Sequence, residues 1–89
     1  MASRPLHDPE YAVVVQVLRD LRREGGLSQV ELAQRLGVDQ SFVSKVERKE
    51  RRLDIAELRR TCLALGISLG SFVERLERAI KSHRKGKPR

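Results

Sequence analysis

The segment that decides the fold is residues 27–47, LSQVELAQRLGVDQSFVSKVE. Ser28 and Glu31 have the spacing of a capping box, in which each side chain bonds the other residue's backbone amide, and this predicts a helix over residues 29–36. Gly37 can take the left-handed conformation that ends a helix. Asp39 is a suitable N-cap for a second helix over residues 40–48. Two short helices joined by so tight a turn predict a helix-turn-helix over about residues 29–48.

The rest of the sequence predicts three more helices and no strand pattern. They are expected over residues 9–24, 55–65 and 69–81. Each is preceded by a capping residue, namely Asp8, Asp54 or Ser68, and glycines follow the first two. The expected fold class is therefore all-α, with five helices in one domain. The expected divisions are a flexible N-terminal arm over 1–8, the helix-turn-helix domain over 9–81 and a disordered basic tail over 82–89.

The chain is basic, with 19 Lys and Arg against 12 Asp and Glu and a formal net charge of +7. Such a charge favours a polyanionic partner, nucleic acid first and an anionic membrane surface second, although a basic protein can also simply be soluble. One Tyr and two Phe are too few for the stacking platforms that single-stranded nucleic acid needs. No apolar run approaches the ~18 residues that span a bilayer, and no signal peptide is recognisable, so we expect a cytoplasmic protein without membrane contact.

The predicted helix over residues 40–48 has two different sides. Placing residues 100° apart gathers the amide, hydroxyl and cationic side chains on one arc and the apolar side chains opposite. The polar arc holds Gln40, Ser41, Ser44, Lys45 and Arg48. Glutamine can pair with adenine, and Arg or Lys with guanine, so this face suits the major groove of DNA. The alternative is an ordinary solvated surface helix.

Glu47 falls on the apolar side of this helix, which is unusual for a carboxylate. Arg22 lies at the edge of the apolar face of the first predicted helix. A buried or half-buried ion pair between them would account for both positions. In the alternative, Glu47 is exposed beside Arg48 or Lys45.

Residues 27–47 resemble the Xre/Cro type of helix-turn-helix domain in the lambda-repressor-like family. RRLDIAEL at 51–58 and ALGISL at 64–69 continue the pattern, and the resemblance covers about residues 18–76. The positions that carry it include Gln29, Leu32, Ala33, Gly37, Ser44 and Glu47. The resemblance implies an all-helical fold of five helices. We therefore expect a sequence-specific regulator that binds double-stranded DNA and represses or controls transcription, a repressor first of all, and that acts as a homodimer.

The resemblance also implies roles for particular residues. Gln29 would contact a phosphate, and Arg22 and Glu47 would form a structural ion pair. Together with the helical face, it gives these candidate DNA-binding residues: Ser28, Gln29, Gln40, Ser41, Phe42, Ser44, Lys45 and Arg48. Two positions depart from the family. Lys49 stands where Gly is frequent, so it must adopt a strained conformation or let the helix continue. Asp39 stands where Ser or Thr is usual, and its charge would repel a nearby phosphate.

An apolar stripe on the last predicted helix extends past the part that the other helices can cover. An exposed patch of this kind favours self-association, and the expected dimer interface is Phe72, Leu76, Ala79 and Ile80. The charged residues beside it, which could set the register, are Glu74, Arg75, Glu77 and Arg78. In the alternative, residues 76–81 fold back on the first helix and cover Val13 or Val17.

Other chemistry finds little support in the sequence. Cys62 falls on the inner face of its helix and is expected in the core. His7 and His83 have no partner at metal-ligand spacing, and no catalytic arrangement is recognisable, so we expect no enzyme, metal or cofactor. Two other functions remain open. One is an antitoxin that binds a toxin protein and controls its own promoter, and the other is a non-specific nucleic-acid packaging protein.

Overall fold

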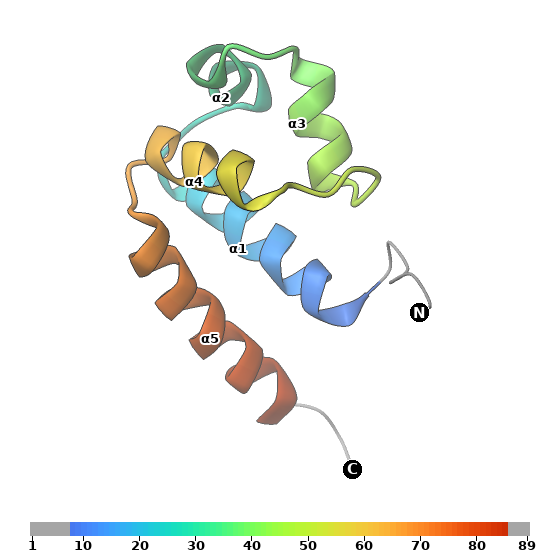
Figure 1. The fold of residues 1–89 in the computed structure, drawn as a ribbon, viewed down its shortest axis with the longest axis vertical. Helices are drawn as coiled ribbons and strands as arrows, with labels where there is room; N and C mark the ends of the chain where they lie inside the picture. Colours follow the sequence, from blue (N-terminus) through green and yellow to red (C-terminus); the bar gives the residue numbers. More distant parts are fainter. Residues whose placement is uncertain (1–7, 86–89) are drawn as a thin grey trace.

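The computed structural model describes residues 8–85, which fold into five helices (Figure 1). Their bounds are α1 Pro9–Glu24, α2 Gln29–Leu36, α3 Gln40–Glu47, α4 Ile55–Ala64 and α5 Leu69–Lys85. The all-α, five-helix prediction is confirmed. The prediction of a disordered tail from residue 82 is wrong for 82–85, because α5 continues to Lys85. The rest of that tail, and residues 1–7 of the expected arm, lie outside the described residues.

The helices begin where the sequence places capping groups. Ser28 and Glu31 form the capping box of α2, and Asp54 and Glu57 form that of α4. Asp39 is the N-cap residue of α3, as predicted, but its side chain makes no capping hydrogen bond. The amide of Phe42, the third helical residue, bonds the backbone carbonyl of Asp39 at 3.0 Å instead of its carboxylate.

The end of α3 depends on a strained residue. Lys49 has φ 65°, in the left-handed region that favours glycine, so the first of its two alternatives is the one adopted. The amide of Lys49 bonds the carbonyl of Val46, and the amide of Glu50 bonds that of Lys45 at 2.8 Å. These bonds satisfy the last carbonyls of α3 and turn the chain toward α4.

Two apolar clusters hold the helices together. The larger contains Val17, Leu18, Leu21, Cys62 and Phe72, from α1, α4 and α5, and the smaller contains Leu32, Ala33 and Val43, from α2 and α3. Cys62 is fully buried, and burial raises the pKa of its thiol to about 11, so it packs as a neutral core residue. Figure 1 shows α2 and α3 at one end of the molecule and the C-terminal half of α5 at the other. No helix within residues 8–85 combines the length and apolar character needed to cross a membrane.

Candidate nucleic-acid interface

The two sides of α3 differ as the sequence predicts. Val43, Val46 and Glu47 are buried. Gln40, Ser41, Lys45 and Arg48 are exposed, and Ser44 is half-buried beside them. One side therefore docks on the protein, while the other presents amide, hydroxyl and cationic groups to solvent. Ser28 is exposed and Gln29 half-buried, and both lie at the N-terminus of α2.

Phe42 does not belong to this exposed face. Its half-buried ring packs against the Leu32–Ala33–Val43 cluster, and the guanidinium of Arg51 lies 4.4 Å from the ring centroid. The structure therefore shows Phe42 in a packing position beside the exposed face, and its predicted contact with DNA stays a prediction. Helical periodicity alone also places it on the apolar side of the helix.

A carboxylate that the sequence reasoning missed lies at the end of the exposed face. Arg48 donates to Ser44 Oγ and forms two bonds of 3.1 Å with the carboxylate of Glu50. The Arg48 guanidinium lowers the pKa of Glu50. Both side chains are about half exposed, so solvent weakens this pair. Its geometry depends on the left-handed turn at Lys49, which no local spacing rule predicts.

The structure brings Arg22 and Glu47 together in a buried pair. Arg22 Nε lies 2.6 Å from Glu47 Oε2, and Nη2 lies 2.9 Å from Oε1. The remaining Nη1 donates to the carbonyl of Leu27 at 2.8 Å, which ties α1 to the start of the helix-turn-helix. Arg22 is 8% exposed and Glu47 6%, so neither charge has much access to water.

Two further side chains, Arg19 and Gln29, reach Glu47. Arg19 donates to its backbone carbonyl at 3.0 Å and holds its Nε 3.5 Å from Oε1. Gln29 Nε2 donates to Oε1 at 2.9 Å. Burial by itself would raise the pKa of Glu47, but the bonds from Arg22 and Gln29 and the nearby positive charges bring it below its ordinary value. Glu47 is therefore an ionised acceptor on α3 that binds side chains of α1 and α2.

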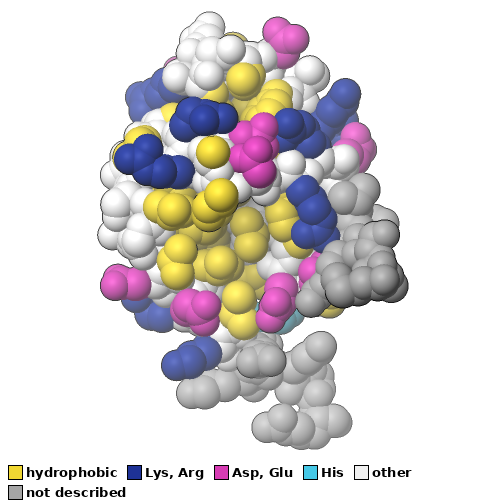
Figure 2. Space-filling view, viewed as in Figure 1, with side chains coloured by type: hydrophobic (Ala, Val, Ile, Leu, Met, Phe, Trp, Pro, Cys, Tyr) yellow, Lys and Arg dark blue, Asp and Glu magenta, His cyan; other side chains and the backbone are white. Residues whose placement is uncertain are grey.

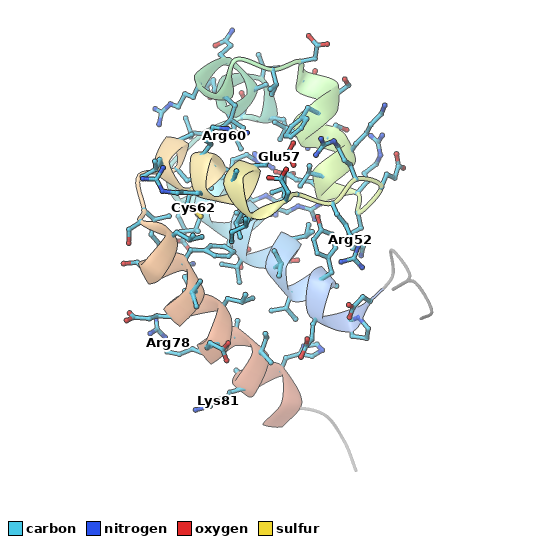
Figure 3. All side chains as sticks on the ribbon, viewed as in Figure 1. Arg52, Glu57, Arg60, Cys62, Arg78 and Lys81 are labelled. Atoms are coloured by element: carbon cyan, nitrogen blue, oxygen red, sulfur yellow. The ribbon has the colours of Figure 1, made fainter. Side chains whose placement is uncertain are left out.

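The loop between α3 and α4 is held by arginines that the sequence reasoning did not single out. Arg51 pairs with both carboxylate oxygens of Glu57, at 3.1 and 2.9 Å. Arg52 lies over the ring of Tyr11, 4.3 Å from its centroid, and the Tyr11 hydroxyl donates to the carbonyl of Arg51. Figure 3 shows Glu57 on the side of α4 that faces α3, and Arg52 near α1. These contacts hold the loop that follows α3 against α1 and α4.

The residues expected to form an exposed patch on the end of α5 are buried to different degrees. Phe72 is fully buried in the core, so its assignment to a dimer interface is wrong. Leu76 and Ala79 pack against the cluster that includes Val17, as in the alternative prediction, and Ile80 is half-buried. Arg75, expected to flank the interface, pairs instead with Glu24 of α1.

Other apolar side chains are exposed on α4 and α5. Ile55 and Leu63 on α4 are 68% and 52% exposed, and Val73 on α5 is 42% exposed. Figure 2 shows hydrophobic side chains gathered over the face that α4 and α5 form, with both signs of charge around them. An open groove of about 400 Å³ is lined by Leu76 and Ile80 of α5 together with Tyr11 and Val14 of α1. Within the described residues, no cluster of three potential metal-ligating side chains occurs.

Comparison with known proteins defines the class to which this fold and site belong. A family model described as Helix-turn-helix matches residues 18–72, more than half of the chain. The chain therefore belongs to the helix-turn-helix family, in its Xre type, which is a family of DNA-binding transcription regulators.

Particular relatives agree with this. An XRE-family like protein from Pseudomonas syringae pv. tomato str. DC3000 is 41% identical, with 80% of this chain and 87% of that one covered and a TM-score of 0.75. The restriction-modification controller protein C.Esp1396I is 31% identical, with 80% and 93% covered and a TM-score of 0.76. Its tetramer has been solved in complex with its natural 35 base-pair operator. A hypothetical transcription factor from Neisseria meningitidis serogroup B is 37% identical over 57 residues, 64% of this chain and 54% of that protein. This chain thus spans about half the length of that relative.

Proposed function

We propose that the chain binds a specific double-stranded operator as a homodimer, with α3 of each protomer in the major groove, and that it represses transcription by occupying that site. The observation that carries the proposal is the exposed face of α3, where Gln40, Ser41 and Lys45 are presented by a helix whose other side is buried. These side chains offer hydrogen bonds to base edges and positive charge to an anionic groove. Repression follows from occupancy alone, whereas activation needs a further protein contact.

The similar controller protein C.Esp1396I supports two parts of this proposal, namely binding to an operator and binding as an oligomer. That protein binds its operator as a tetramer, at 31% identity to this chain. A dimer reads two half-sites about one helical turn apart, on the order of 34 Å, and combines their binding free energies. A single copy with one short recognition helix contacts few phosphates and binds weakly.

For the dimer contact we propose the apolar face of α4 and α5, in place of the end of α5. Its exposed members are Ile55, Leu63 and Val73. Glu77 and Arg59 are exposed on the same two helices and supply opposite charges. In a two-fold dimer each surface meets its own copy, so a surface that carries both signs can be self-complementary. A second copy of this chain is therefore the occupant that we assign to the face.

Sedimentation tests the dimer. The parent should be dimeric at tens of micromolar, and the Leu63→Asp, Val73→Asp double variant should be monomeric with its helical signal retained, because both residues are already exposed. Val30→Asp is the matched control, since Val30 is 45% exposed on α2, and it should remain dimeric. A monomeric parent, or a double variant that still dimerises, contradicts the assignment.

Selection of bound duplexes from a random pool tests sequence-specific binding. The parent should enrich a pair of related half-sites. Gln40→Ala and Lys45→Ala should each lose about 1–3 kcal/mol on the enriched site, with little change in melting temperature. Lys81→Ala is the control, because Lys81 projects from α5 at the other end of the molecule (Figure 3). If both α3 variants bind like the parent, the assignment of the recognition face is wrong.

The two other functions have less support. The packaging function predicts equal affinity for random duplexes, and the same selection would reveal it. The antitoxin function requires a toxin partner, and none of the relatives described above is named as an antitoxin.

A further inference from the structure

A continuous path of hydrogen bonds runs from the buried ion pair to the exposed face of α3. Arg22 donates to Glu47, Gln29 Nε2 donates to Glu47 Oε1 at 2.9 Å, and Gln40 Nε2 donates to Gln29 Oε1 at 3.3 Å. We call Glu47, Gln29 and Gln40 the amide relay. The relay starts at a side chain that is 6% exposed and ends at one that is exposed on the surface.

The first member determines how the second is turned. An ionised carboxylate only accepts hydrogen bonds. Arg22 and Arg19 both place positive charge beside Glu47, which favours its ionised form. Gln29 must therefore turn its NH₂ group inward to Glu47, and its carbonyl oxygen faces outward.

The second member determines how the third is turned. The outward oxygen of Gln29 accepts from Gln40, so one N–H of Gln40 is used within the protein. If the Gln40 amide were reversed, two oxygens would face each other without a proton between them. The held orientation leaves Gln40 with its carbonyl oxygen and its second N–H for a ligand.

These two groups match one base better than another. In the major groove adenine presents an acceptor, N7, beside a donor, the N6 amino group, whereas guanine presents two acceptors, N7 and O6. An amide that offers one N–H and one oxygen pairs with adenine. An amide free to turn could instead offer both N–H groups to guanine.

We propose that Glu47 is a positioning residue for base recognition, which fixes the order of acceptor and donor on Gln40 through Gln29 and so makes the protein prefer adenine over guanine at the base that Gln40 contacts. This inference rests on the proposed function, in which the face of α3 lies in the major groove. It gives the buried carboxylate a role in specificity in addition to its ion pair with Arg22.

The test compares the parent with Glu47→Gln and Gln29→Met. Random-pool selection first locates the base pair at which Gln40→Ala loses discrimination. Affinities are then measured on two duplexes that differ only in A·T against G·C at that pair. The adenine-to-guanine ratio should fall about fivefold or more in both variants. A neutral amide at position 47 can also donate to Gln29, and a methionine side chain at position 29 has no amide to turn Gln40. Ratios at the other base pairs should stay as in the parent.

Val17→Ala is the control for lost stability, because it opens the core around α1 without touching the relay. Its adenine-to-guanine ratio should equal that of the parent at a temperature where every protein is folded. Gln29→Met keeps the Arg22–Glu47 pair, so it decides the question even if Glu47→Gln does not fold. Unchanged ratios in both relay variants, or a preferred base other than adenine, would overturn the relay alone. A parent without any positional preference would overturn the proposed function together with the relay.

Discussion

Replacing Arg22 with Met should lower the free energy of unfolding strongly, although it changes only one side chain. The substitution keeps much of the side-chain volume but removes three hydrogen bonds, two to Glu47 and one to the carbonyl of Leu27. Glu47 would then be a carboxylate of 6% exposure with Gln29 and Arg19 as its remaining side-chain partners. The cost comes mainly from leaving this charge buried and poorly paired.

The contacts of Glu47 indicate how much free energy of unfolding the Arg22→Met variant should lose. Breaking a fully buried pair by removing one member costs about 3–5 kcal/mol. Because Arg19 still lies 3.5 Å from Oε1, we expect a value near the lower limit, about 3 kcal/mol. For a domain of this size each kcal/mol corresponds to about 4–8 °C, so the melting temperature should fall by roughly 12–24 °C. Urea unfolding followed by circular dichroism measures the same free energy.

The difference in stability between the parent and the Arg22→Met variant should become smaller as the pH falls. In the parent the pKa of Glu47 lies below its ordinary value of 4.5, so its stabilising contribution is present above 4.5 and is lost as pH falls through the folded value. Without Arg22, burial dominates and raises this pKa. Protonation of Glu47 then relieves the unpaired charge, and the difference between variant and parent should narrow from pH 7 toward pH 5.

Two controls make the result decisive. Arg23→Met changes an exposed neighbour on the same helix and should shift stability by no more than about 0.5 kcal/mol. The Arg22→Met, Glu47→Leu double variant removes both charges and should recover much of the loss. If Arg22→Met is as stable as Arg23→Met, or its deficit widens on acidification, the buried pair does not act as described.

The remaining predictions concern the ends of helices and one carboxylate. Lys49→Gly should raise the free energy of unfolding by about 1 kcal/mol in urea titrations, because glycine adopts φ 65° without strain, and a loss would contradict the left-handed turn. Asp54→Ala should cost about 1 kcal/mol because it removes a capping bond, whereas Asp39→Ala should cost less than about 0.5 kcal/mol, and equal costs would contradict the cap geometry. Arg51, followed by the Asp54 amide, holds the pKa of Glu57 at about 2, so its stabilising contribution should be lost only as pH falls from 4.5 toward 2. An NMR titration of Glu57 with a midpoint near 4.5 would contradict this.

Local rules predicted the parts of the fold that depend on local interactions. The capping box at Ser28 and the N-cap at Asp54 each involve residues within one helical turn, and the left-handed Gly37 ends α2 at a position that only its own turn decides. The two sides of α3 follow from helical periodicity, and that periodicity also pointed to a partner for Glu47.

Features that depend on several elements at once could not be predicted in this way. The Arg48–Glu50 pair accompanies the turn at Lys49, which adopts φ 65°, and the sequence left open whether Lys49 would adopt such a conformation or the helix would continue. The tail was expected to be disordered because it has no apolar residue, but a helix already nucleated by packing against α1 can continue, and basic residues near its C-terminus are favourable. Phe72 was assigned to an interface because the sequence does not reveal how α5 crosses α1 and α4.

Titration of the isotopically labelled protein with its selected duplex tests the central claim most directly. We expect the largest changes in amide chemical shift over residues 28–29 and 40–48, at the N-terminus of α2 and along α3. Residues 55–64 and 69–85, on α4 and α5, should change little between the free dimer and the complex. Maximal changes on α4 and α5, with those of α3 near zero, would contradict recognition of DNA by the exposed face of α3.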